Sequence, residues 1–475
     1  LSAVHERSGR ALLKLCLKNG GVYIKLGQTV CTLDYLAPEE YVRALQPTLD
    51  RAPTMPISDV RQVVTEELGR PPEDIWDDFD PTPIASASLA QVHTARDRAT
   101  GAKLAIKVQH RGLRETAAGD IHAVQLIVDA IAVASPHLRF EWLAEELARN
   151  LPKELDFSAE GRNAERCAAA LATGCGGCSG GGDADVVVPR VYWETTTPRV
   201  LTMAFEEGKR ATDAAALRAV GIKLPRVAAL VSRTFCDQIF RHGFVHCDPH
   251  GANLLVRPHP RGGSSGGSGG RPQLVLLDHG LYRELDQEFR LDYCRLWKAL
   301  VTADLAGVEH YCRKMHAGDM YALLAAMLTS RPFDEIAGGG GGGCVTGSGG
   351  GAAAEARMVQ GYVNQYMREI SDMLARVPRE MILLFKTNDC LRHIDRSLGA
   401  PINTLVIAAR TVADVLLAEA WADYRAGAKD TTSARVRRWL ARFWQLVGLL
   451  AETLRMRCYI AALQVQEWRL ERRAE

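Results

Sequence analysis

The chain has 475 residues, 47% of them hydrophobic, which is enough to bury a large core and suggests about two to four structural units. Its formal net charge of +2 leaves no strong global field, so we expect no nucleic-acid partner. The twelve cysteines follow no regular framework, which predicts reduced thiols in an intracellular compartment and excludes a disulfide scaffold.

Hydropathy argues against a segment that spans a membrane. No apolar run approaches the roughly 18 to 20 residues needed to cross a bilayer. The longest candidates, at 381–385 and 446–451, are far shorter. We therefore expect a soluble or peripheral protein without a transmembrane helix. Because the chain begins at Leu1 rather than Met, it is compatible with a targeting segment that was removed or omitted.

Residues 1–75 are predicted to form an N-terminal helical extension. Apolar residues recur at helical spacing in 11–17 and again in 22–33, with two glycines between the segments. Lys25 and Gln28 lie three positions apart and therefore on one face of the second helix. On spacing alone, Lys25 is more readily interpreted as a solvated helix lysine than as a functional residue.

Residues 76–205 are predicted to form a small lobe rich in β-strands. Strand patterns at 84–93 and 103–109 indicate a hairpin, and its second strand contains Lys107 after Ala-Ile. In protein kinases a strand lysine in this pattern binds nucleotide phosphates, although alone it more often marks an ordinary exposed lysine. A turn of small residues occupies the place of the kinase glycine-rich loop: Ala85, Ser86, Ala87 and Ser88.

Two helices are expected next, at 114–135 and 140–170. The second contains three carboxylates, Glu154, Asp156 and Glu160. In kinases a carboxylate pairs with the strand lysine and holds it towards the phosphates, so one of these three is expected to turn inward.

The lobe is predicted to end with strands at 186–188 and 200–203, followed by an inter-lobe hinge at 206–208. Backbone groups from Met203 to Phe205 would then face an adenine ring, a placement that rests on the order of the elements.

Three tracts rich in glycine interrupt the pattern, at 174–182, 261–271 and 338–351. None joins a strand to a helix, so we interpret them as disordered surface loops rather than phosphate-binding loops. The first contains Cys175 and Cys178. A C-x-x-C pair can bind zinc or act in redox chemistry, but no second pair lies at a suitable spacing, which favours a flexible linker.

The most informative stretch is 244–280. Asp248 is followed five positions later by Asn253, and an apolar strand then leads to Asp278-His-Gly. This spacing is typical of kinases, where the first Asp faces the acceptor hydroxyl and the Asn and second Asp hold Mg²⁺. The same stretch also offers a transition-metal site: His246, Cys247, His250 and His279. The Asp/Asn spacing favours Mg²⁺, which prefers hard oxygen ligands.

Residues 206–400 are predicted to form a larger helical lobe and 401–475 a C-terminal helical extension, with clear helical patterns at 379–391 and 405–421. A last helix, at 435–468, mixes arginines with Trp and Phe. Such a helix can lie on an anionic membrane, but packing onto the catalytic lobe is the favoured interpretation.

Taken together, these motifs resemble the UbiB/aarF-domain family of atypical, protein-kinase-like enzymes, over about residues 20 to 400. Lys25-Leu-Gly-Gln28 resembles the family's K-x-G-Q signature, 85–88 its alanine-rich loop, and Glu154-Leu-Asp156 its E-x-D signature. Within the family, 246–253, 277–282 and 386–392 are most similar to the mitochondrial aarF-domain-containing kinase 1 subgroup.

The resemblance implies an α+β, bilobal protein-kinase-like fold with a β-rich N-lobe, a helical C-lobe and helical extensions at both ends. It implies that Lys107 contacts nucleotide phosphates and pairs with Glu160. Asp248 would stand at the base position, and Asn253 and Asp278 would ligate Mg²⁺.

It also implies that the helix with Lys25 and Gln28 folds over the active site towards Glu154 and Asp156. This regulatory helix would occupy the place that a protein substrate needs. The functional interpretation of Lys25 is then preferred to the solvated one.

The expected cofactors are ATP or ADP and Mg²⁺. The expected function is phosphotransfer or ATP hydrolysis linked to organellar lipid homeostasis, in the mitochondrion or alternatively a plastid. The alternative is a nucleotide-binding pseudokinase that acts as a membrane scaffold. Nucleotide is the expected partner, with a lipid or membrane surface as a further one; the sequence identifies neither a protein partner nor the phosphoryl acceptor.

Three residues depart from the kinase or family pattern. Ser86 interrupts the alanine-rich loop but keeps it small. His279 replaces the Phe of Asp-Phe-Gly. His250 stands where protein kinases place a phosphate-contacting Lys, and a histidine is only partly charged near neutral pH, which argues against transfer to a protein hydroxyl.

Overall fold

The structure is a computed structural model. It describes residues 2–32, 38–50, 52–134, 141–174, 184–260, 270–316, 321–329 and 377–426, and scattered residues between 443 and 461. The glycine-rich tracts, apart from their edges, and most of the predicted 435–468 helix lie outside these residues. The chain divides into two compact units, the first made of 1–223, 246–282 and 360–397, and the second of 224–245, 283–359 and 398–475.

The first unit begins with four helices: α1 (Ser2–Asn19), α2 (Gly21–Thr32), α3 (Glu39–Leu45) and α4 (Pro47–Asp50). Gly20 and Gly21 both have positive φ, which glycine tolerates best, and this breaks the helix between α1 and α2. Buried side chains from α1, α2 and α3, including Cys16, Ile24 and Leu45, form a shared core.

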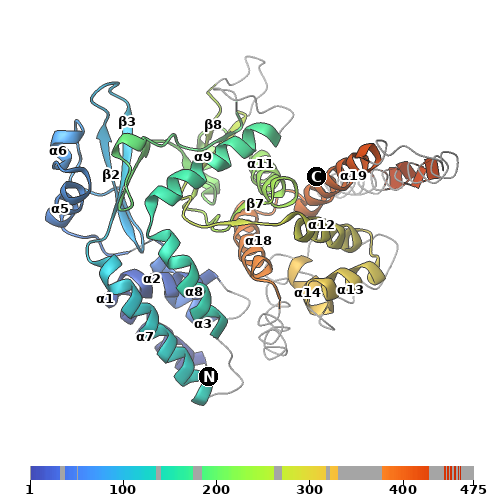
Figure 1. Cartoon of the computed structure of the whole chain (residues 1–475), viewed down its shortest axis with the longest axis horizontal. Helices are drawn as coiled ribbons and strands as arrows, with labels where there is room; N and C mark the ends of the chain where they lie inside the picture. The colour runs from blue at the N-terminus through green and yellow to red at the C-terminus, as the bar shows by residue number, and fades with distance from the viewer. Residues whose placement is uncertain are drawn as a thin grey trace. The chain divides into compact units, whose positions relative to one another are not determined.

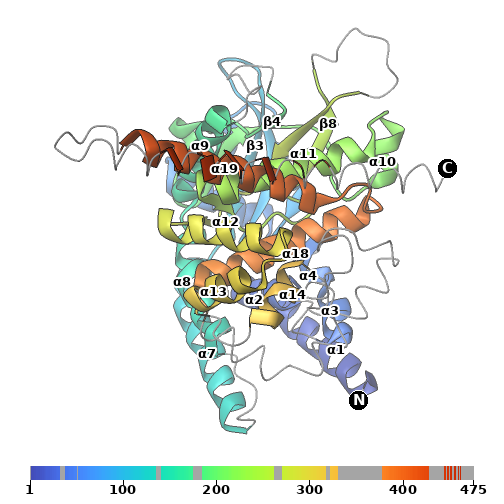
Figure 2. The same cartoon turned by 90° about the vertical axis from the view of Figure 1, so that its right-hand side faces the viewer.

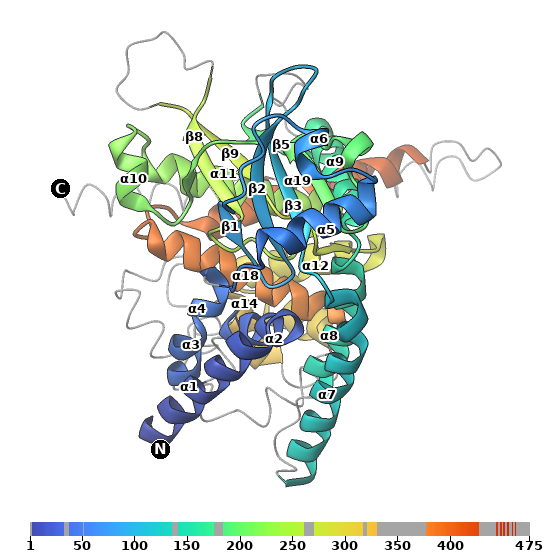
Figure 3. The ribbon, with the colours of Figure 1, turned by 90° about the vertical axis from the view of Figure 1, so that its left-hand side faces the viewer.

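The first sheet has the strand order β1-β2-β3-β5 (Figure 3). Its strands are β1 (Ala85–Ser86), β2 (Ala90–Arg96), β3 (Lys103–Gln109) and β5 (Val200–Ala204), and all neighbours are antiparallel. Leu104, Ile106 and Val108 of β3 pack in one core with α5 (Ile57–Leu68) and lie near α6 (Pro72–Ile75). Because side chains alternate along a strand, Lys107 points to the opposite face.

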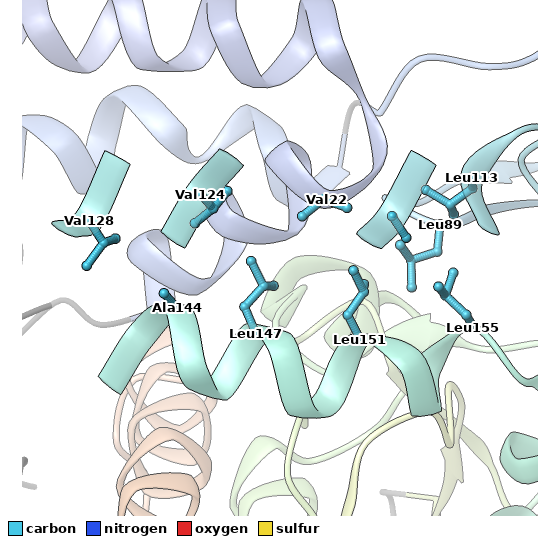
Figure 4. Packing of buried hydrophobic residues seen from close by; sticks show 10 residues of the cluster. Val22, Leu89, Leu113, Val124, Val128, Ala144, Leu147, Leu151 and Leu155 are labelled. Atoms are coloured by element: carbon cyan, nitrogen blue, oxygen red, sulfur yellow. The ribbon is translucent and has the colours of Figure 1, made fainter. Parts of the chain in front are cut away.

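Three helices follow β3: α7 (Leu113–Ala134), α8 (Glu141–Glu154) and α9 (Phe157–Gly174). Figure 4 shows Leu147 and Leu151 pointing from α8 towards Val22 of α2, in a cluster that also contains Val124 of α7. α8 and α9 are separated by two residues only, so the end of one helix and the first turn of the next lie together.

Helix α7 is a longer apolar segment than the hydropathy of the sequence led us to expect. Among the described residues it alone is long and apolar enough to cross a bilayer by length and composition, with 17% of its most apolar window buried. It contains no long uninterrupted apolar run, because Arg114, Glu115 and Asp120 interrupt its first half and Asp129 its second half. Its packing against α8 gives one face of the helix a role in the core.

The second sheet has the order β4-β9-β8-β6. Its strands are β4 (Val186–Val187), β9 (Pro272–Leu276), β8 (Leu254–Pro258) and β6 (Lys209–Arg210). β8 and β9 form an antiparallel hairpin in which Leu254 faces Leu276. The residue before β8 and the residues after β9 therefore meet at the same end of the hairpin.

The remaining elements among the described residues of the first unit are η1 (Trp193–Thr195), α10 (Ala214–Ala219) and α18 (Arg379–Ser397), which contacts α2. The chain passes between the units within β7 (Phe244–His246) and β10 (Tyr282–Glu284), which pair with each other.

The second unit is helical. It contains α11 (Leu224–Cys236), the π-helix η2 (Asp237–His242), α12 (Gln287–Val301), α13 (Leu305–Lys314), α14 (Tyr321–Thr329) and α19 (Thr404–Ala426). Asp286 and Asp304 cap α12 and α13 by accepting backbone N–H groups. α12 packs on α13, and α13 on α14 (Figure 2). Within the core, Phe240 stacks on Tyr293, and Trp297 meets both rings edge-on.

The observed α+β class, with small sheets and many helices, confirms the predicted class (Figure 1). The hairpin at 84–109 and the helices near 379–391 and 405–421 also form where expected. No disulfide joins any of the nine cysteines in the described residues.

The cluster in Figure 4 generates a stability prediction. Leu151 is 1% exposed, so Leu151→Ala leaves a cavity and should lower the free energy of unfolding by about 2–5 kcal/mol. Leu126 of α7 is 56% exposed, and Leu126→Ala should change it by less than about 0.5 kcal/mol. Denaturant titration of both variants measures the difference. Equal losses would contradict this assignment of the core.

Candidate functional site

Lys107 lies at the centre of the site. Its Nζ is 2.8 Å from Oε1 and 2.9 Å from Oε2 of Glu160, a bidentate contact between two buried side chains. Glu160 lies in the first turn of α9, where the helix dipole favours a carboxylate. Of the three acids that the sequence offered, Glu160 is the one that holds Lys107. Burial would lower the pKa of Lys107, but the carboxylates of Asp278 and Glu160 outweigh it and raise that pKa.

Asp278 reaches the same lysine from the end of the β8–β9 hairpin. Its Oδ2 is 3.5 Å from Lys107 Nζ, and its backbone has a φ of 55°, in the left-handed region. The backbone N–H of Gly280 donates to Asp278 Oδ1 at 3.2 Å. A Cβ at Gly280 would lie 3.2 Å from that oxygen, so glycine is what lets the backbone approach.

Asn253 and Asp248 share one short loop before β8. Asn253 Nδ2 donates to the backbone oxygen of Asp248 at 3.0 Å, and its backbone N–H donates to His250 O at 2.8 Å. The loop is thereby fixed by Asn253, whose Oδ1 is the atom of that amide able to ligate a cation. Leu277 N donates to Asn253 O at 2.8 Å, which ties this loop to the strand that ends beside Asp278.

The Asp248 carboxylate lies between two ammonium groups. Lys386 Nζ, from α18, is 2.9 Å from Oδ1, and Lys25 Nζ, from α2, is 4.0 Å from Oδ2. Lys25 Nζ also lies 2.6 Å from Glu154 Oε2 at the end of α8. Burial would raise the pKa of Asp248, but Lys386, His250 and Lys25 together hold it well below its usual range.

Two residues of the predicted regulatory group do not join this cluster. Gln28 Nε2 donates to Thr48 O at 2.9 Å and so ties α2 to α4. Asp156 accepts from Ser158 N at 3.0 Å and lies 3.4 Å from Arg162, which places it as the cap of α9. Of that group, Lys25 contacts the carboxylate of Asp248, and Glu154 contacts Lys25.

The small-residue turn is held by hydrogen bonds to backbone oxygens. Ser86 Oγ donates to Pro53 O at 2.9 Å, and Ala87 N donates to Ala90 O at 2.8 Å. Ala85 lies in β1, and Ser88 is 5% exposed. A role of these four residues in nucleotide binding stays a prediction.

The predicted adenine-facing backbone is partly committed to the sheet. Phe205 N donates to Lys103 O at 3.0 Å, and Ala204 N donates to Arg190 O at 2.8 Å. Met203 is half-buried in β5, opposite Ala105. An adenine ring at this edge would therefore need other groups than these two N–H groups.

Two histidines of the central stretch, His246 and His279, serve the scaffold. His246 Nδ1 accepts from Asp248 N at 3.1 Å, while its Nε2 lies 3.3 Å from Leu277 O. His279 Nδ1 lies 2.8 Å from Tyr282 Oη, and its Nε2 lies 3.1 Å from Leu276 O. Burial lowers the pKa of His279 to about 3. In the part of the chain that the structure describes, no group of three or more His, Cys, Asp or Glu residues is placed to hold a metal ion.

Lys386 is the residue of the site that sequence reasoning did not assign. It entered only as part of a segment similar to a known subgroup, and its distance from Asp248 along the chain gives no periodic signal. Its side chain is 12% exposed. Its position in the sequence is unusual, because it directly follows Leu383, Leu384 and Phe385. These three residues are buried.

Comparison with known proteins bears on this arrangement. A family model described as "ABC1 atypical kinase-like domain" matches residues 47–312. A putative ABC1 protein of Arabidopsis thaliana is 40% identical over 98% of this chain and 84% of its own length. AarF domain-containing protein kinase 1 of Mus musculus is 38% identical over 97% and 84%, and that of Xenopus laevis 40% identical over 84% and 72%.

A solved structure is also similar, titled as the complex of Rv3197 with erythromycin from Mycobacterium tuberculosis. It has a TM-score of 0.47 and 20% sequence identity, over 85% of this chain and 93% of that one.

The buried ion pair generates a prediction. Lys107→Met leaves the carboxylates of Glu160 and Asp278 together without their cation, so the free energy of unfolding should fall by about 3–5 kcal/mol. Adding Glu160→Gln removes one of the two charges and should restore most of that loss. Thermal and denaturant unfolding of both variants measures it. A double variant as unstable as Lys107→Met would show that charge is not the cause.

Gly27 generates a second prediction because it lets α2 approach its neighbours. A Cβ there would lie 3.1 Å from Thr48 Cγ2 and 3.2 Å from Cys16 Sγ. Gly27→Val should therefore lower the free energy of unfolding by about 1–3 kcal/mol. Gly119→Val is the matched control, because nothing lies within 4 Å of a Cβ at that helical glycine. A larger loss at Gly119 would count against the close packing of α2.

Proposed function

Because this chain belongs to the ABC1 atypical kinase-like (UbiB/AarF) family, as its motifs indicated, we propose that it is an enzyme that binds ATP with Mg²⁺ and transfers or releases the terminal phosphoryl group. The observation that carries this proposal is the contact of Lys107 with Glu160, beside Asp278. In kinases this lysine–glutamate pair and the metal-binding Asp must both be in place.

The donor set fits Mg²⁺. Asn253 and Asp278 present an amide oxygen and a carboxylate from one end of the β8–β9 hairpin, and hard oxygen donors are the ligands that Mg²⁺ takes. These two residues would hold the ion. When bound, Mg²⁺ supplies positive charge against the phosphate oxygens.

The chain's own residues would act through charge and position. Lys107 would neutralise phosphate oxygens, while Glu160 keeps its ammonium in place. Asp248 would orient the hydroxyl or water that attacks. Because its pKa is held below the usual range, Asp248 holds a proton poorly, so orientation is its main contribution.

The contacts around Asp248 favour a small acceptor over a protein. Lys25 and Glu154 form an ion pair beside this carboxylate, where a protein hydroxyl would have to enter. His250, which stands where protein kinases have a phosphate-contacting Lys, also argues against a protein acceptor. We infer ATP hydrolysis or transfer to a small or lipid-linked acceptor, in organellar lipid homeostasis. The mitochondrion is the proposed location, with a plastid as the alternative.

A second function is a nucleotide-binding pseudokinase that acts as a scaffold at a membrane. The observation that favours it is the pairing of Asp248 with two ammonium groups, which weakens it as a base. This function requires stabilisation by MgATP without phosphate release.

The main test is Asp248→Asn. It should lower phosphate release at least about 100-fold, because the acceptor loses its orienting carboxylate. MgATP should still raise the thermal midpoint, since the amide removes a negative charge near the phosphates. Phosphate release with and without liposomes, beside a thermal titration, measures both effects.

Asp129→Asn, at an exposed position of α7, is the control and should match the wild type. Wild-type turnover in Asp248→Asn would refute the role of Asp248. A wild type that is stabilised by MgATP but releases no phosphate, with or without liposomes, would favour the scaffold.

A further inference from the structure

The residues of α18 just before Lys386 are buried in the protein. Met381, Leu383, Leu384 and Phe385 are all buried, so this turn of the helix is embedded in the protein. A lysine in such surroundings is costly unless it has a partner. Its Nζ lies 2.9 Å from Asp248 Oδ1, within charge-assisted hydrogen-bonding distance.

Lys386 is the principal partner of Asp248. The other ammonium, of Lys25, lies 4.0 Å from the second oxygen and makes its own short contact of 2.6 Å with Glu154. Among the groups that lower the pKa of Asp248 against its burial, Lys386 has the largest effect. Lys25 is thus shared between two carboxylates, whereas the short contact of Lys386 is with Asp248.

The chain lacks a lysine where the sequence pattern of protein kinases has one. In that pattern a phosphate-contacting Lys stands two positions after the catalytic Asp, and here the residue is His250. A phosphate subsite opposite Asp248 needs a fixed positive charge. The structure brings an ammonium to that carboxylate from α18, a helix far along the chain.

We propose that Lys386 is the cation that faces the terminal phosphate in this site, in place of the lysine that position 250 lacks. This inference rests on the nucleotide site of the proposed function and adds a catalytic residue to it. Lys386 then serves twice, as the partner of Asp248 in the nucleotide-free chain and as a partner of the terminal phosphate when ATP is bound.

The charges of the cluster support this assignment. Three ammonium groups face four carboxylates: Lys25, Lys107 and Lys386 against Glu154, Glu160, Asp248 and Asp278. The cluster is already acidic on balance, so a triphosphate needs every cation present. Among the three ammonium groups, that of Lys386 makes the shortest contact with Asp248, 2.9 Å against 4.0 Å for Lys25, so it lies nearest to the carboxylate at the reacting end.

The test compares two nucleotides that differ by the terminal phosphate, both with Mg²⁺: ADP and the non-hydrolysable imido analogue of ATP. Lys386→Gln should weaken binding of the triphosphate about tenfold or more, the effect of losing one charge-assisted hydrogen bond, and should leave ADP nearly unchanged. Lys386→Arg keeps the charge and should retain most of the preference. Arg396→Gln is the control, an exposed cation near the end of the same helix.

Lys386→Gln is then tested in a chain that already carries Asp248→Asn, because this separates the two possible roles of Lys386. If Lys386 acts only by positioning Asp248, adding Lys386→Gln to Asp248→Asn changes neither affinity, and the proposal is overturned. If Lys386 faces the terminal phosphate, the double variant still loses about tenfold for the triphosphate alone. Equal weakening of both nucleotides would also overturn it, because that indicates general damage to the fold.

Turnover is measured separately, so the two proposals can fail separately. A wild type that binds both nucleotides but releases no phosphate removes the enzyme proposal, while the affinities still decide the role of Lys386. A wild type that binds neither nucleotide overturns both. A Lys386→Gln variant that keeps the full preference for the triphosphate and the wild-type turnover overturns the inference alone.

Discussion

The site depends on keeping opposite charges paired in a place with little water. Lys107 and Glu160 are both buried, and an ion pair in such a place is maintained only when geometry and further hydrogen bonds are good. Here the sheet fixes the lysine and the first turn of α9 fixes the glutamate, with two contacts under 3 Å. Removing either partner leaves the other buried without its counter-charge, and burial already raises the pKa of Glu160 to about 7 with Lys107 present.

The other charged groups of the site are paired with opposite charges as well. Asp278 approaches Lys107, and Lys25 and Lys386 flank Asp248, so each charged group of the cluster compensates another. Under the proposed function, a nucleotide would have to compete for cations that are already engaged in this network. We infer that binding reorganises these pairs, and that the cost falls mainly on the ammonium groups beside Asp248.

Backbone architecture sets the positions from which these side chains start. The β8–β9 hairpin joins Asn253 and Asp278 at one end, whatever the length of the connection at the other. Gly27 and Gly280 permit approaches that a Cβ would obstruct, one between helices and one beside a carboxylate. The packing of the helices around the first sheet thus holds the charged groups of the site at fixed distances from one another.

The sequence by itself determined the elements and the charged residues that accompany them. The hairpin that carries Lys107 and the strands beside Asn253 and Asp278 followed from local periodicity and spacing, which depend on neighbouring residues, and the α+β class followed from the resemblance of the motifs to a known family.

Only the tertiary structure decided which charged groups meet. Spacing left three acids open as partners of Lys107 and the resemblance named Glu160, which the structure pairs with it. The packing alone made Asp156 a helix cap, made Gln28 a tie between helices, and brought Lys386 to Asp248. These outcomes could not be predicted because a contact between residues far apart in the chain depends on how whole helices pack. Local patterns carry no information on that packing.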